Sequence, residues 1–271
     1  MSARRLPTKY LDKPWGRDVL PPLFPHANGK RIGEIWFEEE TDETPELLVK
    51  YLFTGERLSI QVHPDDVEGR KRGLPGGKAE CWYILDCEPD SRLGIGTLEP
   101  LTPERLRAAA LDGSIEGLMN WRPVRPGDFL FVPAGTIHAI GAGISLVEVQ
   151  QNVDITYRLY DYGRPRELHL EDGVAVSRAE PYAQVTPNLA AVQEADLLGE
   201  GDHPFALSLR SFGDGDTAHV GAQDGPGWFV PLTGGGSLDG QHWQAGECWL
   251  LDGPVHLTAS EPSRALIATL R

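Results

Sequence analysis

Short runs of alternating or continuous apolar residues, bounded by Gly, Pro or acidic residues, follow one another along most of the chain. They predict strands at residues 32–38, 47–53, 58–63, 80–85, 129–132, 145–150 and 155–162, and later at 205–212, 227–232, 247–251 and 266–270. Many short strands with frequent turn residues are typical of β-barrels and sandwiches. The pattern therefore predicts a mainly β chain.

One stretch has the pattern of a helix. Thr102 stands in the N-cap position, Pro103 at the first helical position, Leu106 and Ala110 share a face, and Gly113 ends the run. Residues 64–78 are read as a second short helix or a loop. We therefore expect few, short helices, with a helical insertion at about residues 101–120.

The chain changes in texture near residue 181, where Gly, Asp and Ala become frequent. Residues 245–251 (AGECWLL) resemble residues 126–132 (PGDFLFV), and a turn and a histidine follow each segment. This repetition predicts two β halves, a metal-binding half at residues 1–180 and a degenerate half at 181–271. The second half offers no Gln-x-His partner for His256, so we expect no metal there.

Composition limits the class of partner. The formal charge of −15 over 271 residues argues against nucleic acid and anionic membranes. Cys81, Cys87 and Cys248 are odd in number, which suits a reducing cytoplasm, and we expect them to be small buried hydrophobic residues. The sequence contains no apolar run long enough to span a bilayer and no secretory signal at its start, so we expect a cytoplasmic protein, a monomer or weak homodimer.

Four residues are candidate metal ligands. Gln61 and His63 are two apart on a predicted strand, so both face the same side, while His138 opens a strand after a Pro-x-Gly corner. Glu80 opens another predicted strand. A lone histidine is usually a hydrogen-bonded core residue, but this combination favours a metal site. Two imidazoles, a carboxylate and an amide oxygen suit zinc, and iron or manganese would tolerate the same set.

Two segments resemble the metal-binding motifs of the cupin barrels. They are Gly-x5-Gln-Val-His at residues 55–63, with Gln in place of the usual first histidine, and Gly-x5-Pro-x-Gly-x2-His at 127–138. With LSIQVHPDD (58–66), GKAECWY (77–83), VPAGTIHAIG (132–141) and DITYRLYDYGR (154–164), residues 14–164 resemble type I mannose-6-phosphate isomerase, in its short bacterial form. The resemblance implies a cupin jelly-roll barrel and a second, cupin-like β half. It also implies a zinc enzyme that interconverts mannose 6-phosphate and fructose 6-phosphate.

The resemblance also implies roles for single residues. The family's zinc ligands, one ion per chain, fall on Gln61, His63, Glu80 and His138. Its essential arginine falls on Arg158 and its motif lysine on Lys78. Arg164 stands where longer members of the family carry a lysine. We expect the phosphorylated sugar to be bound by Ser59, Lys78, Arg158 and Arg164.

The chemistry asks for further groups. Moving a proton between C1 and C2 of an open-chain sugar passes through a cis-enediolate, which needs a base and a nearby cation. Arg158 is a permanent cation. Glu148 alternates with two valines, and if these pack outward, it faces the interior as the base. The alternative is that Glu148 only orients a neighbour, in which case Lys78 is the next candidate.

Other possibilities remain at this stage. Arg70, Lys71 and Arg72 form a basic segment that is either a phosphate site or a solvated surface loop. The competing functions are a ferrous-iron cupin oxygenase and a non-catalytic sugar-binding cupin. The glutamine in the ligand set argues against the oxygenase, and retention of Arg158 argues against the binding protein.

Overall fold

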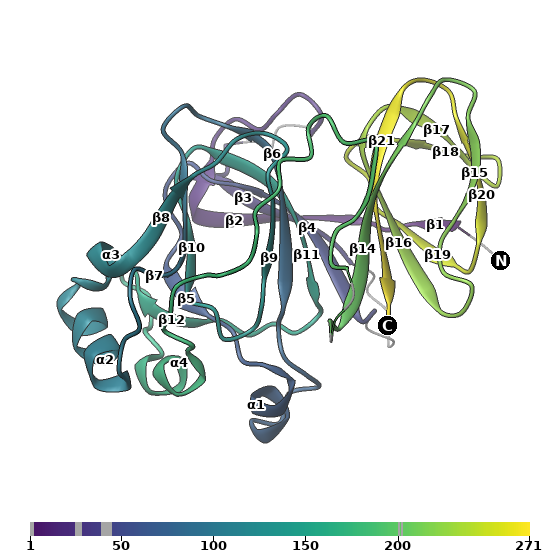
Figure 1. Cartoon of the computed structure of the whole chain (residues 1–271). Helices are drawn as coiled ribbons and strands as arrows, with labels where there is room; N and C mark the ends of the chain where they lie inside the picture. Colours follow the sequence, from purple (N-terminus) through teal and green to yellow (C-terminus); the bar gives the residue numbers. More distant parts are fainter. Residues whose placement is uncertain (1–2, 25–28, 39–44, 200, 202) are drawn as a thin grey trace.

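The computed structural model describes residues 3–24, 29–38, 45–199, 201 and 203–271. Within them, the chain forms four β-sheets and four short helices (Figure 1). The packing clusters show the order of the layers: helices, a five-stranded sheet, a six-stranded sheet, and then the two sheets of the C-terminal half. The prediction of a mainly β chain with few short helices is confirmed.

The five-stranded sheet carries two of the candidate metal ligands. Its strands, in spatial order, are β12 (Tyr157–Tyr160), β5 (Ile60–Val62), β10 (His138–Ile140), β7 (Arg92–Thr97) and β8 (Met119–Pro123). In it, His138 is directly opposite Gln61, and Gln61 is directly opposite Arg158 on its other side. Residues far apart in the sequence thus meet in one row across the sheet.

The six-stranded sheet faces it. Its strands, in spatial order, are β2 (Thr8–Arg17), β3 (Ile32–Phe37), β4 (Leu47–Phe53), β11 (Ile144–Gln151), β6 (Glu80–Cys87) and β9 (Phe129–Val132). Side chains from both sheets, including Trp82, Leu93 and Ile140, form the apolar core between them. Val147 and Val149 point the other way, into a core shared with the C-terminal half. The condition that we set for Glu148 to face the interior is therefore met.

The C-terminal half consists of two packed sheets. One contains β1 (Ala3–Arg5), β19 (Trp249–Asp252), β16 (Pro226–Thr233), β21 (Ser263–Leu270), β14 (Phe205–Phe212) and β13 (Glu194–Asp196). The other contains β15 (Thr217–Val220), β20 (Val255–Ala259), β17 (Gly235–Leu238) and β18 (Gln241–Gln244). Cys81 and Cys248 are buried in the core between the halves and Cys87 is half-buried, and all three are free thiols.

The N-terminal segment differs from our expectation. We placed the first strand at residue 32, but β1 and β2 precede it, so that expectation is wrong. Strand β1 pairs with β19 of the C-terminal half, as the purple segment at the right of Figure 1 shows. Strand β2 tolerates Pro14 because it is an edge strand with an irregular register. The division of the chain at residue 180 remains a prediction.

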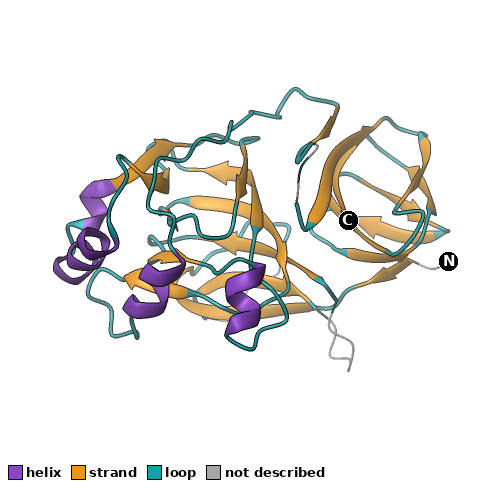
Figure 2. Cartoon of the chain, turned by 60° about the horizontal axis from the view of Figure 1, so that its bottom comes forward, coloured by secondary structure: helices purple, strands orange, loops and turns teal. Residues whose placement is uncertain are grey.

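The helices of the described residues all belong to the first half (Figure 2). They are α1 (Asp66–Lys71), α2 (Pro103–Asp112), α3 (Ile115–Leu118) and α4 (Leu170–Val176). Helix α2 begins and ends as predicted, because Thr102 Oγ1 accepts a hydrogen bond from Arg105 N at 3.3 Å and Gly113 adopts the left-handed conformation. Among the described residues, no helix combines the length and the apolar character that crossing a bilayer requires.

Candidate active site

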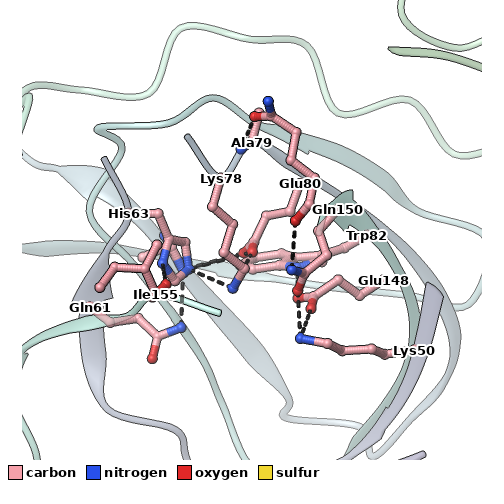
Figure 3. Close-up of polar contacts among 12 residues, drawn as sticks. Lys50, Gln61, His63, Lys78, Ala79, Glu80, Trp82, Glu148, Gln150 and Ile155 are labelled. Atoms are coloured by element: carbon pink, nitrogen blue, oxygen red, sulfur yellow. Dashed lines mark hydrogen bonds and ion pairs between the residues drawn. The ribbon is translucent and has the colours of Figure 1, made fainter. Parts of the chain in front are cut away.

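Three candidate metal ligands converge between the two sheets of the first half. His63 Nε2 lies 3.4 Å from Glu80 Oε2, and His138 Nε2 lies 3.3 Å from Glu80 Oε1. One ligand atom from each of the three residues lies within 4.8 Å of the others, and each side chain is about 1% exposed. In Figure 3, the side chains of His63 and Glu80 extend toward this centre from opposite sides.

The corner before β10 delivers His138. Thr136 N donates to the Pro133 carbonyl at 3.1 Å, which closes a β-turn with Gly135 at its third position. Gly135 has a φ of 84°, a value that favours glycine in that position. The Pro-x-Gly spacing seen in the sequence therefore forms a tight turn, and His138 follows that turn at the start of β10.

Both imidazoles are held as neutral donors of a lone pair. His63 Nδ1 lies 2.8 Å from the Ile155 carbonyl, and His138 Nδ1 lies 2.9 Å from the Thr136 carbonyl. A carbonyl accepts only, so each Nδ1 carries the proton and each Nε2 presents its lone pair to the centre. Burial lowers the pKa of His138 to about 4, and it lowers the pKa of His63 well below its ordinary value.

Gln61 completes the group of four. Its Nε2 lies 3.3 Å from His138 Nε2, while its Oε1 accepts from Ser59 Oγ at 3.1 Å. Rotating the amide by half a turn would direct Oε1 to the centre and Nε2 to the Ser59 hydroxyl, which also accepts hydrogen bonds. Gln61 is therefore within reach of the ligand role, although its oxygen faces Ser59 here.

Glu80 is a buried carboxylate whose neighbours are mostly other ligands. Neither oxygen has a protein hydrogen bond among the described residues, although Lys78 Nζ lies 3.1 Å from Oε2. Burial raises the pKa of Glu80 to about 7, with a further contribution from the charge of Glu148, while Lys78 opposes the rise. Lys78 Nζ is also 3.1 Å from His63 Nε2, so two of the candidate ligand atoms already lie beside a positive charge. This set of donors fits zinc, which binds histidine nitrogen and carboxylate oxygen.

Glu148 lies beside this group and is tied to two neighbours. Its Oε2 accepts from Trp82 Nε1 at 3.0 Å, and its Oε1 lies 3.3 Å from Lys50 Nζ. Burial raises the pKa of Glu148, but the charges of Lys50 and Lys78 outweigh this effect, so the pKa lies below its ordinary value. Glu148 is therefore a buried, ionised carboxylate at neutral pH.

Lys50 was not predicted from the sequence. It is buried, it donates to Gln150 Oε1 at 2.5 Å, and it lies 4.6 Å above the Trp36 ring (Figure 3 shows its contacts with Glu148 and Gln150). The segment LLVKYLF was read only as an apolar strand. The signal was its single charged residue, because a lysine in a buried strand requires a partner.

A cavity of about 360 Å³ opens on these residues. Its lining includes the predicted residues Ser59, Gln61, Lys78, Glu148 and Arg158, and also Lys50, Arg166 and His169, which were not predicted. Arg164 is not among the lining residues, because its guanidinium binds the Arg57 carbonyl at 2.7 Å and the Asp161 carboxylate at 2.9 Å.

The basic segment at the C-terminal end of α1 lies away from the cavity. Lys71 and Arg72 both pair with Glu68, and Arg70 lies 3.6 Å from Asp66. None of the three basic residues lines the cavity. Their charges are therefore used in contacts along and beside α1, as the surface-loop interpretation expected.

Comparisons with known proteins bear on the resemblance. No protein-family model matches the chain. Mannose-6-phosphate isomerase ManA of Bacillus subtilis (strain 168) is 41% identical over 162 residues, covering 55% of this chain and 51% of that protein. Mannose-6-phosphate isomerase of Streptococcus mutans is 39% identical over 165 residues, 59% of this chain and 52% of that protein. The resemblance to mannose-6-phosphate isomerases is confirmed. The chain spans about half the length of the curated relatives it matches.

Solved structures share the fold over the whole chain. The mannose 6-phosphate isomerase from Bacillus subtilis has a TM-score of 0.80 at 24% identity and covers 100% of both chains. A zinc-bound mannose 6-phosphate isomerase has a TM-score of 0.73 at 15% identity, again with 100% coverage of both. The chain therefore has the cupin-type phosphomannose isomerase fold, including its C-terminal half, where the sequence alone indicated only a general likeness.

Proposed function

We propose that the chain is a zinc-dependent aldose–ketose isomerase that interconverts mannose 6-phosphate and fructose 6-phosphate. The observation that carries the proposal is that Glu148, a buried and ionised carboxylate, lines the same cavity as Gln61 of the metal-ligand group and as Lys78, which contacts that group. An isomerase of this class needs a base beside a metal in a site that excludes water. The names of the curated relatives support the same activity.

We assign Gln61, His63, Glu80 and His138 as the ligands of one zinc ion per chain. The buried carboxylate and the two outward-facing imidazole lone pairs support this assignment. When bound, zinc supplies a Lewis acid that withdraws electrons from the sugar oxygens next to the migrating proton. The solved relative described as zinc-bound supports this choice of metal.

Glu148 is the proposed base that takes the proton from C2 and returns it at C1. Its low pKa keeps it ionised at neutral pH, and the bonds from Trp82 and Lys50 fix its orientation. Lys78, which is buried and cationic, stabilises negative charge near the metal ligands. Arg158 donates hydrogen bonds to the enediolate from the neighbouring strand, opposite Gln61.

The ring of charged groups favours this reaction over the two alternatives. A ferrous-iron oxygenase has no use for Glu148, Lys50 and Lys78 around its substrate, and a sugar-binding protein has no need for a buried base. The phosphorylated sugar is the proposed partner, with Ser59, Lys78 and Arg158 on the cavity wall. A cytoplasmic location remains a prediction.

A coupled assay with mannose 6-phosphate, together with metal analysis of the same sample, tests the proposal. We expect the protein to form fructose 6-phosphate, which the coupling enzymes convert with a change in absorbance or fluorescence. Chelation should abolish this turnover, and added zinc should restore it. Zinc-loaded protein without isomerase turnover would contradict the proposal. Oxygen consumption with ferrous iron would favour the oxygenase instead.

A further inference from the structure

Arg158 carries an unpaired positive charge into the cavity. Among the described residues, its guanidinium forms no hydrogen bond or ion pair, and it is partly buried. Arg158 and Arg166 line the same cavity, where burial lowers the pKa of Arg158 and the charge of Arg166 lowers it further. Placing two like charges together in a partly desolvated site is unfavourable unless an anion binds there.

Arg166 enters the same cavity in a fixed orientation. Its Nε lies 2.6 Å from Asp161 Oδ2 and its Nη2 lies 2.7 Å from Asp161 Oδ1, a two-point contact with a side chain that is only 2% exposed. This contact uses one edge of the planar guanidinium and leaves Nη1 outside it. Asp161 therefore acts as a support that directs the remaining edge of Arg166.

Counting its buried and half-buried groups, the cluster has an excess of positive charge. Asp161 also pairs with Arg164 at 2.9 Å, so one buried carboxylate serves two arginines, and Arg158 adds a third guanidinium. The other nearby acids, Asp154 and Glu167, are exposed, so solvent screens their charges. In a chain of net charge −15, a positive cluster facing a cavity is a local site for an anion.

We propose that Arg166, oriented by Asp161, binds the phosphate group of the sugar phosphate, while Arg158 serves the reacting end of the same molecule. Arg158 belongs to the strand that is paired with β5, next to Gln61, whereas Arg166 comes from the loop that follows this strand. The ligand class is a phosphate monoester dianion, which guanidinium groups bind through two parallel hydrogen bonds. The inference rests on the proposed function for the identity of the sugar, but not for the anion site.

Phosphate binding to the zinc-loaded protein tests the inference directly. The probe is inorganic phosphate, measured by calorimetry and as a competitive inhibitor. We expect Arg166→Gln to weaken phosphate binding and to raise the KM for mannose 6-phosphate by about 10-fold or more, with a smaller change in kcat. The matched control is Arg107→Gln, which removes the same charge from an arginine of α2 that pairs with Glu171 outside the cavity.

The outcomes separate this inference from the proposed function. Unchanged phosphate binding in a folded Arg166→Gln protein, or no saturable phosphate binding to the wild type, would overturn the inference while isomerase activity could still stand. Weakened phosphate binding in a protein without isomerase turnover would support the anion site and contradict the function. If Arg166→Gln fails to fold, Arg166→Lys decides: we expect several-fold weaker phosphate binding, because lysine lacks the second edge, and wild-type binding would overturn the inference.

Discussion

Lys50 and Glu148 are directly opposite each other on the neighbouring strands β4 and β11, and Lys50 Nζ lies 3.3 Å from Glu148 Oε1. Both side chains are less than 10% exposed. A buried carboxylate is costly without a partner, so this ion pair, together with the charge of Lys78, keeps Glu148 ionised. The pair links the stability of the sheet to the protonation state of the proposed base.

Replacing Lys50 with Met should therefore destabilise the protein. Breaking one side of a buried ion pair typically costs about 3 kcal/mol or more, and chemical denaturation measures this loss. Without Lys50 the pKa of Glu148 rises. The loss in the free energy of unfolding should therefore be largest at neutral pH and smaller in acid, where Glu148 takes up a proton. Lys71→Met is the control, because Lys71 pairs with Glu68 on an exposed face and should cost less than about 1 kcal/mol.

The same substitution should shift the pH profile of the reaction. The base must be ionised, so kcat/KM falls as the pH drops through the pKa of Glu148. Loss of Lys50 raises that pKa, and the acidic limb of the profile should move to higher pH than in the wild type. A limb that stays in place in Lys50→Met would show that Glu148 does not set it.

The metal ligands can be removed without removing the core. His63 directly follows β5 and His138 opens β10, and their neighbours Val62 and Ala139 supply the apolar contacts. We expect the double variant with His63→Ala and His138→Ala to bind less than about one tenth of the wild-type zinc, with little change in the circular dichroism spectrum. His256→Ala, which alters an exposed histidine of β20, should keep one zinc per chain. Full zinc occupancy in the double variant would refute the ligand assignment.

Arg158→Lys should lower turnover more than substrate affinity. Lysine keeps the charge but loses the planar fork, and transition-state stabilisation should fall by about 2 kcal/mol or more. The split is opposite to that expected for Arg166→Gln, whose effect is on KM. The folded state should be unaffected, because the Arg158 guanidinium has no hydrogen-bonded or ionic partner among the described residues. Near-normal kcat in Arg158→Lys would assign this arginine a structural role.

Local patterns were sufficient for the elements with strong sequence signals. Strand β4 and strand β14 have the predicted limits, because continuous or alternating apolar residues end at clear turn residues. Helix α2 was found from Thr102 and Gly113, whose preferences are local. The four ligand candidates could be found because tight turns and a two-residue strand spacing fix the direction of each side chain.

Long-range pairing could not be read in the same way. Strand β1 pairs with β19 across most of the chain, and nothing in the segment Ala-Arg-Arg indicates that partner. Lys50 was hidden for a related reason: its role depends on Glu148 and Gln150 of another strand. The Asp161–Arg166 contact likewise arises from how a loop folds back on β12, which no periodic pattern encodes.

Exchange of the C2 proton of mannose 6-phosphate in deuterated water tests the central claim most directly. The measurement compares the zinc-loaded wild type with Glu148→Gln, which keeps the shape of the side chain and its bond from Trp82 but removes the base. We predict that the wild type incorporates deuterium in a metal-dependent reaction. Glu148→Gln should bind zinc and substrate, but its exchange rate should be lower by about 100-fold or more. Exchange in Glu148→Gln at the wild-type rate would contradict the account.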